Sequence, residues 1–183
     1  MSQRRRSQLP KESNPRQPEG PSKVERVQAL LAEGAQLLAA KRPGEALPML
    51  TAAWALAPDN AAAAINLGAA YILQGKHDLA VPVLEAAAQL EPDNAMVWVN
   101  LAAAYLGKLP FAAAERQNRA IQAFERALTL DPTAANVHYN LGLIYLERKD
   151  HQRAATHFTA ALATDPDDRD ARYYLDNICQ RGE

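Results

Sequence analysis

The sequence predicts an all-α fold, an α-solenoid of four helix–turn–helix repeats followed by a C-terminal capping helix. Three observations favour this class. Of the 183 residues, 38 are alanine, the residue with the highest helix propensity. Aromatic residues make up only 6% of the chain, and β-branched residues are sparse in any one stretch, which disfavours an all-β fold. One pattern of small and large apolar residues also occurs four times along the chain, as in stacked helical repeats.

The composition excludes several classes of protein. The only cysteine, Cys179, cannot form an internal disulfide or a zinc site built from cysteines. No apolar run reaches about 18 residues, so we expect no membrane span. Arg4, Arg5 and Arg6 are not followed by the apolar stretch that a secretory or twin-arginine signal needs, and the expected location is therefore the cytoplasm.

Residues 1–23 are predicted to form a disordered, basic, proline-rich tail, and residues 24–183 the folded domain. Residues 1–26 carry seven Lys/Arg and three Asp/Glu, a net charge of +4, whereas the rest of the chain has a net charge of -5. Apart from the initial methionine, Leu9 is the only large apolar residue of the tail, so burial cannot offset its chain entropy. The tail is either a solubilising leader or a tether. Nucleic acid is an unlikely ligand, because the basic run is short and lacks aromatic residues.

Four segments of the chain, residues 27–60, 61–94, 95–134 and 135–168, end in similar sequences with a proline in second place. These ends are Ala57-Pro58-Asp59-Asn60, Glu91-Pro92-Asp93-Asn94, Asp131-Pro132-Thr133-Ala134 and Asp165-Pro166-Asp167-Asp168. Small residues recur at three positions: Gly34, Gly68, Ala102, Gly142; Ala46, Ala80, Ala120, Ala154; and Ala53, Ala87, Ala127, Ala161. Large residues recur as well: Leu50, Leu84, Phe124, Phe158; Leu67, Leu101, Leu141; and Tyr71, Tyr105, Tyr145. The chain therefore contains four copies of one structural unit.

Each unit is expected to form two helices that pack against each other. In residues 61–94, Gly68 and Tyr71 lie on one face of a first helix, and Ala80 and Leu84 lie on one face of a second. The small side chains let the two backbones approach closely, and the large side chains fill the space around them.

Turn residues set the predicted ends of these helices. Gly75 is expected to break the first helix and Asp78 to cap the second, which Pro92 stops. Pro48 and Pro82 lie in or just past the first turn of their helices, where the missing N–H removes at most one hydrogen bond. We therefore expect no sharp kink at either proline.

The third unit has six extra residues between Leu106 and Arg119. They include Pro110, which begins a helix-prone run and is suited to the first position of a helix. We expect the second helix of this unit to be longer at its start by about one to two turns. The alternative is a lengthened connector.

Residues 169–180 are predicted to form a single capping helix, because they begin no complete fifth unit. An apolar stripe on this helix can cover the last exposed face of the stack, as terminal repeats require. The stripe consists of Ala171, Tyr174, Leu175 and Ile178. Cys179 is expected to pack at the edge of this stripe as an unreactive side chain.

The repeated unit resembles the tetratricopeptide repeat, a helix–turn–helix of 34 residues. The resemblance covers residues 27–168, although the first unit has Leu30 and Glu33 where a large aromatic residue and a leucine are usual. It implies a right-handed stack whose first helices line a concave groove. In this family the groove commonly binds a peptide or a helix of a partner protein.

The groove is expected to be lined by a second face of the first helices, which is largely apolar and almost uncharged. A soluble protein rarely exposes a contiguous apolar patch without a function. Asn66, Asn100 and Asn140 recur on this face, and the family uses such asparagines to bind the backbone of a peptide. The alternative is that these amides only bond to a neighbouring helix or loop. The predicted partner-binding residues are Ile65, Asn66, Ala69, Met96, Val99, Asn100, Ala103, Asn136, Tyr139, Asn140 and Leu143.

One partner class is disfavoured by the residues of this face. Some family members bind the acidic carboxyl terminus of a chaperone through a cationic clamp. That clamp needs Lys or Arg where this chain has Ala62, Ile65, Met96 and Val99. An apolar peptide or an amphipathic helix fits these residues better.

No catalytic residue, metal ligand or cofactor is predicted. The chain has no glycine-rich phosphate loop and no nucleophile elbow. The aspartates between residues 165 and 170 lack the spacing and the glycine of a calcium loop. The four histidines show no metal-binding spacing: His77, His138, His151 and His157.

The sequence therefore predicts a non-catalytic module that binds a partner protein, as an adaptor, an assembly factor or a subunit of a complex. One alternative is a self-associating scaffold, in which the groove or the convex face is buried in a homo-oligomer. A weaker alternative is a tether to nucleic acid or to a membrane through the basic tail. The fold alone does not choose a pathway or name a partner.

Overall fold

The computed structural model describes residues 20–109, 112–134 and 136–181, and within them it contains nine α-helices and no β-strand. The predicted all-α class is confirmed. The disorder predicted for the tail falls mainly on residues 1–19, which lie outside the described residues. No helix in the described parts is both long and apolar enough to cross a bilayer. The helices are α1 (Lys23–Ala39), α2 (Pro43–Leu56), α3 (Ala61–Leu73), α4 (His77–Leu90), α5 (Ala95–Leu106), α6 (Ala114–Leu130), α7 (Val137–Glu147), α8 (His151–Thr164) and α9 (Arg169–Arg181).

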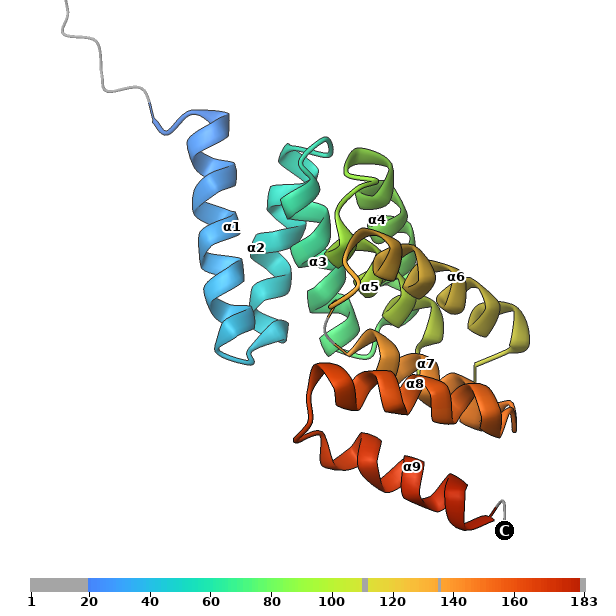
Figure 1. Ribbon diagram of the computed structural model, residues 1–183. Helices are drawn as coiled ribbons and strands as arrows, with labels where there is room; N and C mark the ends of the chain where they lie inside the picture. The colour runs from blue at the N-terminus through green and yellow to red at the C-terminus, as the bar shows by residue number, and fades with distance from the viewer. Residues whose placement is uncertain (1–19, 110–111, 135, 182–183) are drawn as a thin grey trace, which may run out of the picture.

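The helices form one elongated stack with α1 and α9 at opposite ends (Figure 1). Short turns join consecutive helices, which therefore run in opposite directions. The closest neighbours are α1 with α2, α3 with α4, α5 with α6, and α7 with α8, and α9 packs on α8. The architecture is thus a solenoid of four helix pairs with a single terminal helix, as the sequence predicts.

In three of the four helix pairs, a large side chain of the second helix lies directly over a glycine of the first helix, and the third pair has Ala102 at this position. A Cβ placed on Gly68 would lie only 2.4 Å from Cγ of Leu84. In the fourth pair, a Cβ on Gly142 would lie 2.7 Å from the ring of Phe158. Both distances are shorter than any normal carbon contact, so glycine at these positions sets the distance between the two backbones.

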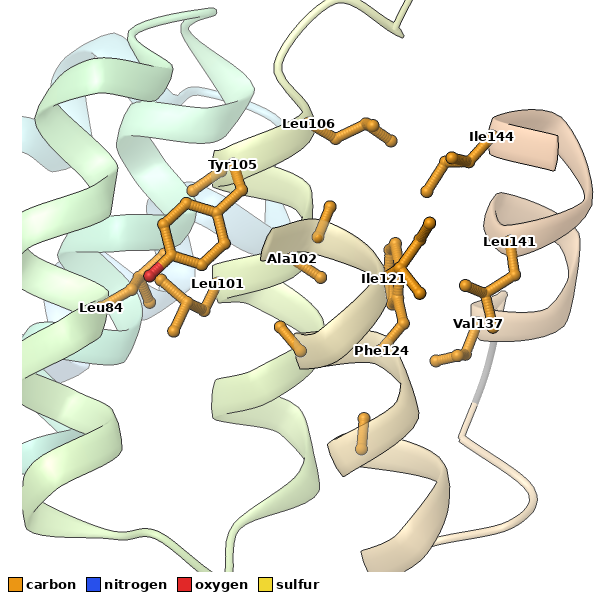
Figure 2. Close-up of a cluster of buried hydrophobic side chains, with 14 of the residues drawn as sticks. Leu84, Leu101, Ala102, Tyr105, Leu106, Ile121, Phe124, Val137, Leu141 and Ile144 are labelled. Carbon is orange, nitrogen blue, oxygen red and sulfur yellow. The ribbon is translucent and has the colours of Figure 1, made fainter. Parts of the chain in front are cut away.

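The core runs through the stack as a layer between first and second helices. Leu84 of α4, Tyr105 of α5, Phe124 of α6 and Leu141 of α7 all belong to one continuous cluster (Figure 2). The alanines at the start of the second helices have no exposed surface: Ala46, Ala80, Ala120 and Ala154. Their small size lets the second helices sit close to their neighbours.

The structure confirms the predicted helix break at Gly75 and corrects the predicted helix cap at Asp78. Gly75 has a positive φ of 70° just after the end of α3, which is the chain reversal expected of it. Asp78 does not cap α4, because the N-cap is Lys76 and makes no side-chain capping bond. Instead, the Asp78 carboxylate accepts a hydrogen bond from Arg116 of α6 at 2.7 Å.

The extra residues of the third pair lengthen α6 at its start. This helix has 17 residues, whereas α4 has 14, a difference of about one turn. It begins at Ala114, and Pro110, which was expected at the first helical position, lies outside the described residues. Arg116 in the added turn donates to two carbonyl oxygens at the end of α5, at 2.8 and 3.2 Å. The added turn is therefore fixed to α5.

The terminal helix α9 covers the end of the stack. Ala171 is fully buried, and the other three residues of the predicted stripe are partly buried against the core. Asp176 occupies the position that corresponds to Gly142, so a carboxylate stands where a further helix would have to pack. Cys179 is exposed, which corrects the expectation that it packs at the edge of the stripe.

The junction between α6 and α7 differs from the earlier ones. α7 begins five residues after Pro132, whereas α3 begins three residues after Pro58. Asn136, which precedes α7, has a left-handed backbone with φ of 61°. α5 packs against α3, but within the described residues α7 packs on α6 and scarcely touches α5. The fourth pair is therefore set apart from the first helices of the other pairs.

The packing at Gly68 leads to a testable prediction. Gly68→Ala should lower the free energy of unfolding by about 1–3 kcal/mol, because Leu84 must move to make room for the methyl group. Urea unfolding measures the change. In a Leu84→Ala background the same substitution should be neutral or stabilising by up to about 1 kcal/mol, because alanine favours a helix. Equal destabilisation in both backgrounds would show that this contact is not the cause.

Candidate functional site

The predicted partner-binding face is formed mainly by α3 and α5, which pack next to each other. Seven of the predicted residues lie on these two helices: Ile65, Asn66, Ala69, Met96, Val99, Asn100 and Ala103. We call them the α3–α5 surface. None of the seven is buried, and Met96 has 62% of its surface exposed. The structure thus brings these side chains onto two neighbouring helices and leaves them accessible.

The amides of the predicted asparagine row differ in their hydrogen bonds. In Asn140, Nδ2 donates to the carbonyl oxygen of Asn136 at 2.8 Å, so this amide bonds within its own chain. The side chains of Asn66 and Asn100 make no hydrogen bond to any other described residue. Both are half-buried on the α3–α5 surface. Two of the three amides are therefore available to a ligand.

The predicted residues of the fourth pair lie apart from the α3–α5 surface, because α7 scarcely touches α5. Tyr139 packs edge-on against Phe158 of α8, with ring centroids 6.1 Å apart. It also lies 6.4 Å from the ring of Tyr174 of α9. Leu143 is half-buried, and Asn136 is exposed just before α7 begins. Tyr139 thus contributes to packing between helices as well as to the surface.

A polar network holds α5 between its two neighbours. The hydroxyl of Tyr105 donates to Oε1 of Glu85 on α4 at 2.7 Å. Arg119 of α6 donates to the same carboxylate oxygen at 2.7 Å and lies 4.1 Å from the centroid of the Tyr105 ring. Burial, followed by the hydrogen bond to Glu85, raises the pKa of Tyr105 to about 12. The phenol therefore stays protonated, and the network joins α5 to α4 and α6.

Sequence reasoning missed a cleft beside the terminal helix. It has a volume of about 380 Å³ and lies between α9 and the turn that joins α7 to α8. Tyr173 on its rim has 64% of its surface exposed. The paired tyrosines Tyr173 and Tyr174 were the only signal in the sequence, and just one of them belongs to the capping stripe. The cleft is lined by Leu146, Lys149, His151, Tyr173, Tyr174, Asn177 and Ile178.

Two histidines meet in the fourth pair. Nδ1 of His138 lies 3.2 Å from Nδ1 of His157, and the His157 ring stacks on Tyr145. One ring must be neutral to accept the bond. Burial lowers the pKa of His138, and burial together with the nearby His138 lowers the pKa of His157. In the described parts of the chain no three His, Cys, Asp or Glu side chains are placed to hold a metal ion.

This histidine pair predicts a pH-dependent stability. Because the folded chain holds both pKa values below the ordinary value of about 6.5, the unfolded chain binds more protons as the pH falls. The free energy of unfolding should therefore decrease from about pH 7.5 to about pH 5.5, as urea unfolding at each pH would measure. His157→Phe should reduce this slope, whereas His151→Phe on the exposed side of α8 should not. An equal slope in all three proteins would contradict the assignment.

Comparison with known proteins identifies the repeat. Models of the tetratricopeptide repeat match residues 37–80, 62–104 and 111–169. A search of curated proteins finds no match.

Solved structures show the same fold. A MamA fragment that begins at its position 41, from Desulfovibrio magneticus RS-1, is 26% identical with a TM-score of 0.66, over 78% of this chain and 77% of that chain. MamA MSR-1 is 32% identical with a TM-score of 0.64, over 76% and 77%. A chain of the APC/C hetero-tetramer Cut9–Hcn1 is 26% identical with a TM-score of 0.73, over 83% of this chain but only 29% of that chain.

Proposed function

The chain belongs to the tetratricopeptide repeat family, and from this premise we propose that it binds an apolar peptide or an amphipathic helix of a partner protein on its α3–α5 surface. The family supports a protein-interaction module. The binding mode is our inference from the residues of this surface. In this proposal the chain is non-catalytic and acts as an adaptor, an assembly factor or a subunit of a complex.

The observation that carries the proposal is the chemistry of the α3–α5 surface. All seven residues are uncharged, five are apolar, and none is buried. Leu73 at the end of α3 adds a further large apolar side chain with 61% of its surface exposed. Leu, Ile, Val and Met side chains adapt to the apolar face of a helix or to the side chains of an extended peptide.

The two asparagines add a contact that is independent of partner sequence. Each amide can donate and accept a hydrogen bond, and neither Asn66 nor Asn100 bonds to a described residue of the chain. On binding, they can pair with the backbone of a partner segment that the apolar residues have desolvated. One chain of the solved Cut9–Hcn1 hetero-tetramer has the same fold over the matched part, and it is assembled with a second protein. We propose a comparable subunit role for the present chain.

This proposal can be tested with two matched double variants of the full chain. Val99→Glu with Asn100→Ala should reduce partner recovery from the native cell by about tenfold or more, because a buried unpaired charge opposes binding. Thr129→Glu with Gln122→Ala makes the same kinds of change on exposed residues of α6 and should recover partners like the wild type. Quantitative mass spectrometry of the recovered proteins is the readout, and circular dichroism verifies the fold. Undiminished recovery by the first variant would exclude this surface.

A further inference from the structure

The two long edges of the solenoid carry opposite charge. One edge is formed by the turns that join one helix pair to the next, and the other by the turns within each pair. Among the described residues of the first set of turns there are seven carboxylates and no Lys or Arg: Asp59, Glu91, Asp93, Asp131, Asp165, Asp167 and Asp168. The second set holds one carboxylate, Asp150, and six cations: Lys41, Arg42, Lys76, Lys108, Arg148 and Lys149. We call these the acidic edge and the basic edge.

Most of these charges form no ion pair with another described residue. On the acidic edge, only Asp93 forms an ion pair among the described residues, with Arg126 at 3.0 Å. On the basic edge, Arg42 is the only cation so paired among the described residues, with Glu45 at 2.6 Å, and the one carboxylate, Asp150, pairs with Arg153 at 3.4 Å. The other edge charges are exposed or half-exposed. Each edge therefore presents a row of charges that an oppositely charged surface can neutralise.

Helix ends account for part of this separation, because four of the carboxylates precede helix starts and four of the cations follow helix ends. The remaining charges are not explained in this way. Carboxylates are favourable at the start of a helix and cations at its end, because of the helix dipole. Glu91, Asp131 and Asp165 instead stand at the ends of α4, α6 and α8. Arg42 and Lys76 likewise stand at the starts of α2 and α4. Five edge charges are thus placed against the preference of their own helices.

The two edges also correspond to each other along the chain. Each helix pair contributes one turn to each edge (Figure 1). When two copies lie side by side in the same orientation, a turn of one acidic edge faces a turn of the other copy's basic edge. The net charge of -1 leaves little overall repulsion between copies.

We propose that copies of this chain associate side by side, with the acidic edge of one copy against the basic edge of the next. A two-fold dimer would place like charges together, so the contact is heterologous and leaves one edge of each terminal copy unoccupied. Association therefore continues into rows or closes into a ring. The α3–α5 surface takes no part in this contact and stays open to a partner protein.

Charge reversal on each edge of the full chain tests this proposal. The acidic-edge variant combines Asp59→Lys, Glu91→Lys and Asp167→Lys, and the basic-edge variant combines Lys41→Glu, Lys76→Glu and Lys108→Glu. None of the six residues is buried or in an intramolecular ion pair. Sedimentation velocity reports the size of each protein, and circular dichroism verifies its fold.

In salt of about 25 mM the wild type should form oligomers that grow with concentration, and its association should weaken by about tenfold or more at about 500 mM. Each reversal variant alone should be monomeric, because three reversals bring the altered edge to a net charge of about -1 and so remove most of the attraction between the edges of neighbouring copies. An equimolar mixture of the two variants should associate again, since the edges are once more complementary. The charge-preserving set Lys41→Arg, Lys76→Arg and Lys108→Arg should behave like the wild type.

A monomeric wild type in low salt would overturn the proposal, as would a mixture of the two variants that stays monomeric. Association of the basic-edge variant with itself would also overturn it and would indicate that the basic tail, residues 1–23, binds the acidic edge instead. The Val99→Glu, Asn100→Ala variant should associate like the wild type. Its behaviour separates failure of the edge contact from failure of partner binding on the α3–α5 surface.

Discussion

The close approach of two helix backbones, at a position that holds glycine or alanine, is the constraint on which the rest of the structure depends. Where Gly68 or Gly142 lies beneath a large residue of the second helix, the pair can close and the alanines of the second helix reach their neighbours. In α9 the corresponding position holds Asp176, which is exposed. One steric requirement thus explains how the helix pairs with glycine at this position pack.

The junction before α7 determines how far a continuous surface can extend. Left-handed backbone at Asn136 and a late helix start separate α7 from α5, although the fourth pair retains the packing of Gly142 against Phe158. The first helices of the first three pairs therefore stay in contact, whereas α7 scarcely touches α5 and joins the stack through α6. The Glu85–Tyr105–Arg119 network joins α5, which carries part of the α3–α5 surface, to α4 and α6.

The molecule offers different chemistry on its face and on its edges. The α3–α5 surface is apolar with two available amides, which suits contacts that exclude water. The acidic edge and basic edge are exposed charges, which act at longer range and respond to salt. The two edges lie at opposite ends of the helices, and the α3–α5 surface lies along α3 and α5 between them.

The sequence by itself determined the all-α class, the four helix pairs, the buried small positions and the apolar stripe of α9, because these features recur at a fixed spacing. It also placed seven of the candidate residues on α3 and α5. Only the tertiary structure decided that Asn140 bonds to its own helix, that Asp78 pairs with Arg116, and that α7 stands apart from α5. The physical reason is that periodicity specifies which residues share a helix face. The backbone angle of one turn residue and the distance between remote side chains depend on the assembled fold.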